Sequence, residues 1–245
     1  MLDNIADPSN GYNLFFFGGD LVEYGFSASQ WGEAFRALSS TTSEIPTRLT
    51  IGNHESLFAG LGRYENYAYP TGMDIQTGSR LWYHIDVGKV HFLVLDIEWS
   101  AESYTSAQAA WLETQLKAIP AGDWKIVVSH GFYYASGSFV DGWQWYDNPE
   151  TIDALTPLFE KYKVDLVLSG HQHQIELLQY GGVTYAIAGA FGGLPDAFRT
   201  YTSPASLWFV HGAYGFVDVS ISGGQCNVTF RSPDNAALKT FTITK

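Results

Sequence analysis

The chain has 245 residues, 46% of them hydrophobic, and a formal net charge of −12. A chain of this length can bury one large core or two smaller ones. The acidic balance argues against a nucleic-acid partner, since no basic face is available to neutralise phosphates. The single cysteine, Cys226, excludes an internal disulfide and a cysteine-rich zinc site, and the sequence contains no apolar run of the ~20 residues needed for a membrane span.

The first 180 residues alternate short strands with helices. Apolar runs that end in polar residues predict strands at 14–20, 48–53, 125–130 and 165–171. Helical spacing of apolar residues predicts helices at 27–40, 105–119 and 149–163, with Thr105 or Ser106 as the cap of the second. The segment 81–96 is predicted as a hairpin that turns at Val-Gly-Lys.

Beyond Gly181 the pattern changes to β-type runs separated by Gly, Ser, Pro and Asn, without a helical stretch. No repeat or linker interrupts the chain, so residues 1–245 are predicted to form one domain. Alternating β and α units followed by β-hairpins indicate an α/β fold in which two mixed sheets pack together with helices outside.

Residues able to bind a divalent cation stand at the ends of the four predicted strands. They are Asp20, Asn53 with His54, His130, and His171 with His173. In open α/β sheets, ligands bind beyond the carboxyl ends of the strands, and carboxylate, amide and imidazole groups suit transition metals. The other three histidines, His84, His91 and His211, lie within β-type runs and are interpreted as hydrogen-bonded structural residues.

Four of these segments, "GGDLVEYG", "IGNHE", "VVSHG" and "SGHQH", resemble four of the five signature blocks of the calcineurin-like metallophosphoesterases. The resemblance spans roughly residues 13 to 215. It implies a four-layer α/β/β/α sandwich of two mixed sheets flanked by helices. It also implies a dinuclear centre of Mn, Zn or Fe that hydrolyses phosphate monoesters or diesters of small molecules or macromolecules.

The resemblance assigns a role to each matching residue. Asp20 would bridge two metals; Asn53, His130 and His171 would complete one metal site, and His173 would bind the other. His54 would be a non-ligand histidine that, with Asn53, meets the phosphate and assists the leaving group. Elementary chemistry supports these roles, because two cations ~3.5–4 Å apart can clamp an in-line displacement and lower the pKa of water to give a metal-bound hydroxide.

Two nearby residues concern finer details of this site. Glu23 occupies the position where some family members carry a carboxylate beside the catalytic histidine; it is equally consistent with a solvated loop acid. Tyr24 lies one residue after the position of the tyrosine ligand of purple acid phosphatases, so a ferric–tyrosinate site is not expected.

The family's first block, an Asp-x-His after a first strand, is missing. Only nineteen residues precede Asp20, too few for a strand–helix–strand unit of ~30 residues. "MLDNIADPSNGY" is therefore predicted as the tail of a first helix in a truncated chain, and neither Asp3 nor Asp7 is expected to substitute for the block. Any signal for secretion or periplasmic export would lie upstream.

The missing block has two predicted consequences. The chain is expected to hold one metal ion where a complete member holds two. The strand at 14–17 would present an unpaired edge, which predicts self-association or low solubility.

Two alternatives remain beside an active phosphoesterase. One is an inactive member of the same fold that keeps one metal site and serves as a scaffold. The other is a zinc hydrolase of the metallo-β-lactamase type, disfavoured because Gln174 and Ile175 stand where that family continues with Asp-His. The aromatic stretch 131–149 is either a substrate-facing loop or a packed surface loop.

Overall fold

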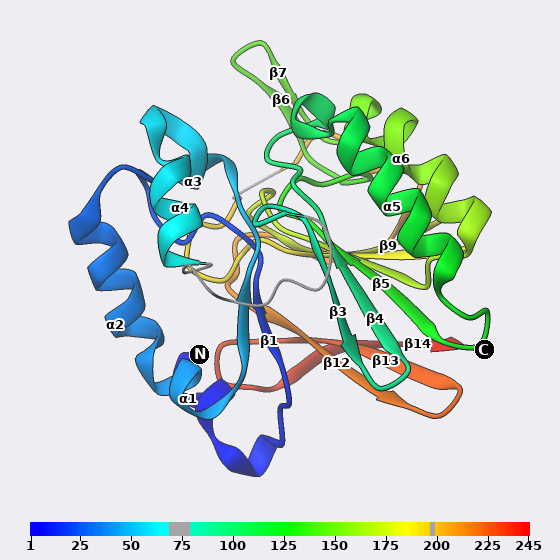
Figure 1. Cartoon of the computed structure of the whole chain (residues 1–245), viewed down its shortest axis with the longest axis horizontal. Coiled ribbons are helices and arrows are strands. Elements are labelled where there is room, and N and C mark those ends of the chain that lie inside the picture. Colours follow the sequence, from blue (N-terminus) through cyan, green and yellow to red (C-terminus); the bar gives the residue numbers. More distant parts are fainter. Residues whose placement is uncertain (69–78, 197–198) are drawn as a thin grey trace.

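The computed structural model describes residues 1–68, 79–196 and 199–245. Its largest element is a seven-stranded mixed sheet (Figure 1). In spatial order the strands are β11 (Ser206–Val210), β9 (Ile175–Tyr180), β10 (Val183–Ala188), β8 (Leu166–Ser169), β5 (Trp124–Val128), β4 (Val90–Val94) and β3 (Tyr83–Val87). The four central strands β10, β8, β5 and β4 run parallel to one another. Their near-continuous Val, Ile and Leu runs are typical of strands buried on both faces.

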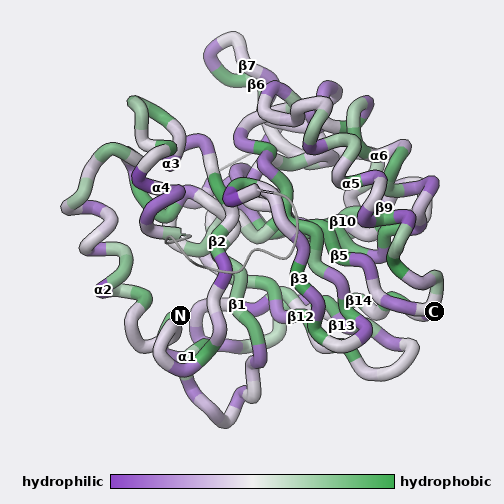
Figure 2. The backbone as a smooth tube through the Cα atoms, in the orientation of Figure 1, coloured by the Kyte–Doolittle hydropathy of each residue, from purple (hydrophilic) through white to green (hydrophobic). Residues whose placement is uncertain are grey.

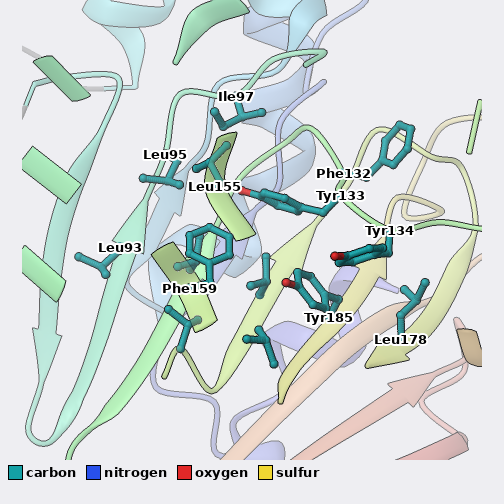
Figure 3. Packing of buried hydrophobic residues seen from close by; sticks show 14 of the residues in the cluster. Leu93, Leu95, Ile97, Phe132, Tyr133, Tyr134, Leu155, Phe159, Leu178 and Tyr185 are labelled. Carbon is teal, nitrogen blue, oxygen red and sulfur yellow. The ribbon is translucent and has the colours of Figure 1, made fainter. Parts of the chain in front are cut away.

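Two helices, α5 (Ser106–Ala118) and α6 (Pro149–Tyr162), cover one face of this sheet (Figure 1). Each begins at a side-chain cap: Thr105 accepts a hydrogen bond from the backbone N–H of Gln108, and Asn148 accepts one from Thr151. The core between sheet and helices is apolar and includes Leu93, Leu155 and Phe159, all fully buried (Figure 3).

The opposite face of the sheet packs against a second layer of strands. Three form an antiparallel sheet, β12 (Phe216–Ser222), β13 (Gln225–Arg231) and β14 (Ala237–Thr244). The other two, β1 (Phe15–Phe17) and β2 (Thr47–Leu49), form a separate parallel pair, covered by α2 (Ala28–Glu44). Trp31 of α2, Ile126 of β5 and Phe230 of β13 belong to the core on this side. Figure 2 shows the hydrophobic residues concentrated along inner strands such as β10.

The remaining elements are short. They are α1 (Leu2–Ala6), η1 (Pro8–Asn10), α3 (Asn53–Ser56), η2 (Leu57–Ala59), α4 (Leu61–Tyr67), η3 (Ala101–Ser103), β6 (Ser138–Val140) and β7 (Trp143–Trp145). Strands β6 and β7 form a hairpin that projects from the body of the molecule (Figure 1). No helix among the described residues is long and apolar enough to cross a membrane.

The predicted fold class is confirmed: a large mixed sheet is flanked by helices. The hairpin at 81–96 and the helical tail near the N-terminus also appear, as β3–β4 and α1. The second sheet differs from expectation because it is divided. A cavity of about 1030 Å³ separates its two parts and is lined by Phe16 of β1 and Val219 of β12. The sequence did not predict α3, α4, β6, β7, β9 or β11, which are mostly short or lie in segments without clear periodicity.

Candidate active site

The candidate ligands converge because the strands that precede them are parallel. Strand β1 pairs with β2, and β5 pairs with β8, so the carboxyl ends of each pair lie at one edge. Asp20 follows β1, and Asn53 starts the short helix α3 after β2. His130 follows β5, and His171 follows β8.

The ligand atoms of Asp20, Asn53 and His171 all lie within hydrogen-bonding distance of His130 Nε2. His130 Nε2 is 3.1 Å from Asp20 Oδ2, 3.1 Å from Asn53 Oδ1 and 3.1 Å from His171 Nδ1. His171 Nδ1 is 3.0 Å from Asn53 Oδ1. The far nitrogen of His130, Nδ1, is 2.7 Å from the carbonyl oxygen of Gly18, to which it donates. A metal-binding histidine is commonly held in this way.

The pKa shifts within the cluster are those expected of a site that attracts positive charge. Burial alone would raise the pKa of Asp20, but the charges and hydrogen bonds of His130 and His54 outweigh it and lower this pKa to about 2. Burial alone would lower the pKa of His130, yet the Asp20 carboxylate raises it overall. Burial, and then the charge of His130, lower the pKa of His171 to about 3, so its ring stays neutral with a free lone pair. A proton on His130 Nε2 would stand where a cation would bind, and metal binding would release it.

These four residues therefore fit a transition-metal ion. Their donor set comprises two imidazole nitrogens, one amide oxygen and one carboxylate oxygen. The ligand atoms of Asp20, His130 and His171 all lie within 4.8 Å of one another.

A buried carboxylate holds the loop that carries Asp20. Glu55 accepts hydrogen bonds from the backbone N–H groups of Asp20 (2.8 Å), Leu21 (2.7 Å), Val22 (3.2 Å) and Gly52 (2.8 Å). Asp20 itself has a φ of 55°, in the left-handed region that non-glycine residues seldom adopt. Four charge-assisted hydrogen bonds offset the cost of this conformation.

Close packing around the cluster also requires glycine. Gly19 has a φ of 91°, and a Cβ atom there would lie 2.5 Å from His130 Nδ1. His171 too has a positive φ of 62°. Strained backbone conformations at two of the four candidate ligands are typical of functional sites.

His54 lies next to this cluster. Its backbone N–H donates to Asp20 Oδ1 over 3.1 Å, and its ring Nδ1 lies 2.8 Å from the main-chain carbonyl oxygen of Glu23. Glu23 therefore contacts His54 through its backbone, and its side chain is exposed. The predicted role of the Glu23 carboxylate stays a prediction.

His173 lines the same cavity as Asp20, His54 and His171. Its ring Nδ1 is 2.8 Å from the carbonyl oxygen of Leu194, and its backbone N–H donates to Asp196 Oδ2 over 3.0 Å. Among the described residues, His173 is not part of the close group formed by Asp20, His130 and His171. Its role as the ligand of another ion stays a prediction.

Aromatic rings enclose His171. Trp145 stacks on its ring at 5.5 Å between centroids, Phe132 stacks at 5.9 Å, and Trp99 meets it edge-on at 4.9 Å. Trp145 and Phe132 belong to the aromatic stretch 131–149, which therefore reaches the site. Phe139 and Trp143, in the hairpin of the same stretch, expose 62% and 71% of their surface.

The sequence did not indicate the contacts of two residues of this site, Glu55 and Trp145. Glu55 was visible as the last residue of "IGNHE", three residues after Gly52, a spacing at which Glu can accept from the start of a helix. Trp145 had no local signal, because its contact with His171 joins separate segments. Tyr24 packs against the rings of Phe26 and Phe58. Its absence from the metal site stays a prediction.

A model of the calcineurin-like phosphoesterase family matches residues 1–175. The chain belongs to this family. A purple acid phosphatase of Glycine max is 30% identical over 86% of this chain and 44% of its own length. A nucleotide pyrophosphatase/phosphodiesterase of Hordeum vulgare is 23% identical over 98% of this chain and 74% of its own length. A probable inactive purple acid phosphatase of Arabidopsis thaliana is 25% identical over 71% of this chain and 30% of its own length.

Solved structures of the family share the fold. Purple acid phosphatase PPD1 from yellow lupin (Lupinus luteus) seeds superposes with a TM-score of 0.81 at 22% identity, covering 99% of this chain and 48% of that one. The structure described as GAP50, the anchor in the inner membrane complex of Plasmodium, has a TM-score of 0.71 at 17% identity, with coverages of 99% and 82%. The chain thus spans less than half the length of the purple acid phosphatases of Glycine max and yellow lupin.

Proposed function

We propose that this chain hydrolyses phosphate esters with one transition-metal ion, Mn, Zn or Fe, held by Asp20, Asn53, His130 and His171. The observation that carries the proposal is the convergence of these four donors at one place, where Asp20, His130 and His171 line an open cavity together with His54. The bound ion would supply an activated water and offset the negative charge of the phosphate.

His54 is the proposed proton donor to the leaving group. Its Nδ1–H is held by the Glu23 carbonyl oxygen, so Nε2 is the nitrogen that can give up a proton. After donation, the ring remains as the neutral tautomer that this hydrogen bond favours. A positioned acid of this kind contributes ~10²–10⁴-fold to a rate.

Asn53 and His54 are the residues proposed to meet the phosphate. They are consecutive, and the N–H of His54 donates to Asp20 Oδ1. A substrate bound by the metal cluster would therefore lie against His54. The aromatic rings of Trp99 and Trp145 would form one wall of its binding site.

A second candidate function is metal binding without hydrolysis. The naming of some relatives as probable inactive purple acid phosphatases favours it. Retention of His54, which is not among the four candidate ligands, favours hydrolysis instead, because a scaffold has no physical need for a proton donor at that place.

Hydrolysis of p-nitrophenyl phosphate and bis(p-nitrophenyl) phosphate by the metal-loaded chain tests the proposal and separates monoesterase from diesterase activity. We expect activity that excess chelator abolishes, that added metal restores, and that His130→Ala removes. Hydrolysis that persists unchanged in chelator or in His130→Ala would refute it. Stoichiometric metal binding without hydrolysis of either ester would identify the inactive alternative.

A further inference from the structure

A second cluster of ligand atoms lies on the hairpin β3–β4, away from the candidate active site. The antiparallel register places Asp86 of β3 opposite His91 of β4. His84, two residues before Asp86, projects to the same side of its strand. Asp86 Oδ1 is consequently 2.7 Å from His84 Nε2 and 2.7 Å from His91 Nδ1, and the two ring nitrogens are 3.3 Å apart.

Each histidine of this hairpin cluster (His84, Asp86 and His91) has a hydrogen-bond acceptor at its far nitrogen. His84 Nδ1 is 2.9 Å from Gln115 Oε1 of α5. His91 Nε2 is 3.4 Å from Asp123 Oδ2, just before β5. Acceptors in these places hold the ring N–H outward and are the usual support of metal-binding histidines.

The outward N–H groups create a conflict inside the cluster. If each neutral ring carries its hydrogen on the far nitrogen, the near nitrogens turn lone pairs toward each other and toward the Asp86 carboxylate. Three acceptors 2.7–3.3 Å apart repel one another unless a cation lies between them. Ligand atoms about 2.0–2.1 Å from a tetrahedral zinc ion are themselves roughly 3.3 Å apart, so little movement is needed to admit one.

We infer that His84, Asp86 and His91 bind a divalent transition-metal ion, with zinc the best match to two imidazoles and one carboxylate. The two histidine side chains are only 11% and 12% exposed, whereas Asp86 is 44% exposed. Asp86 therefore lies on the solvent side, where the ion would enter and where water would complete its coordination. This ion would be additional to the single one predicted from the sequence.

The site would join the edge strand β3 to the rest of the large sheet. Strand β3 pairs only with β4 in the described part of that sheet. Through Gln115 and Asp123, the ligands are also connected to α5 and to the segment before β5. An ion that binds only the folded hairpin stabilises it by mass action.

Zinc titration of the full chain in the His171→Ala background tests the inference, because that background disrupts the buried cluster of Asp20, Asn53, His130 and His171. We expect one equivalent of zinc to bind and the thermal midpoint to rise. Asp86→Asn, which keeps the size of an exposed side chain, should weaken binding at least tenfold, and His91→Ala should abolish it. Cobalt in place of zinc should give the visible absorption of a tetrahedral site.

The alternative is that His84, Asp86 and His91 are joined by hydrogen bonds alone, with a proton in the place of the ion. In that case the histidine NMR signals of His84 and His91 would not respond to zinc. Absence of zinc binding in the His171→Ala background would overturn the inference. Binding that survives both Asp86→Asn and His91→Ala would overturn it as well, by placing the ion elsewhere.

Discussion

The buried cluster around Asp20 and the hairpin cluster around Asp86 offer the same kinds of donor atom in different surroundings. The first lies beyond the carboxyl end of β5, on the wall of a cavity of about 1030 Å³ that His54 also lines. The second lies at the amino end of β5, about 17 Å away along a five-residue strand, beside α5. Both clusters offer donors for an ion, whereas hydrolysis also needs room for a substrate and a proton donor. We therefore place the proposed hydrolysis at the buried cluster alone.

The largest expected effect comes from Asp20→Asn. Asp20 supplies the only carboxylate among the four proposed ligands, so its neutral replacement should remove the ion from the buried cluster and reduce ester hydrolysis to the background rate. Elemental analysis and steady-state kinetics measure the two losses. His91→Ala is the matched variant of the hairpin cluster, and its activity should equal that of the unmodified chain.

Replacing His54 should separate chemistry from metal binding. We expect His54→Ala to lower kcat by ~10²–10⁴-fold, with the metal content unchanged because His54 is not one of the proposed ligands. Rates with substrates of increasingly acidic leaving groups refine the test. The loss should shrink as the leaving group needs less protonation, and an equal loss for every leaving group would argue against a proton donor.

Much of the buried cluster could be predicted from the sequence, because each ligand follows a short apolar run that ends in Gly or Ser. Glu55 and Trp145 could not be assigned their contacts in this way, since these depend on how distant segments pack. His84 and His91 were interpreted as structural because neither ends a strand. In the structure the hairpin turns at Gly88 and Lys89, which places Asp86 opposite His91, and only this register brings the cluster together.

The support of the Asp20 loop is tested by Glu55→Gln. In this variant the side-chain amide would point its N–H groups at the backbone N–H groups that now donate to the Glu55 carboxylate. The lost hydrogen bonds should lower the free energy of unfolding by about 2–4 kcal/mol. Urea denaturation measures it. Glu23→Gln removes a nearby carboxylate that is exposed, and a change below ~0.5 kcal/mol is expected there. Equal effects of the two changes would contradict the role given to Glu55.

A smaller effect is expected from Trp145→Ala. The Trp145 ring stacks on His171, and its loss should raise KM for aryl phosphates by about 2- to 10-fold, the usual value of an aromatic contact. Trp143→Ala, at the exposed end of the same hairpin, is the control and should change KM less. The opposite order would place substrate contact at the end of the hairpin.

The two clusters also lie beside sheets of different size, and the open edge of the smaller sheet predicts self-association. The hairpin cluster lies on the seven-stranded sheet, whereas Asp20 follows β1, which in the described part of the chain pairs only with β2. An open strand edge beside a cavity can pair with another chain. Light scattering should show a mass that rises with concentration, and addition of an upstream strand ending in Asp-x-His should reduce it. A monodisperse, high-melting monomer unaffected by that addition would contradict this expectation.

The most direct test measures bound metal and ester hydrolysis together in the unmodified chain, His171→Ala and His91→Ala. We expect each variant to lose one ion and only His171→Ala to lose hydrolysis. Hydrolysis retained in His171→Ala, or lost together with the hairpin ion in His91→Ala, would contradict the assignment of the chemistry to the buried cluster.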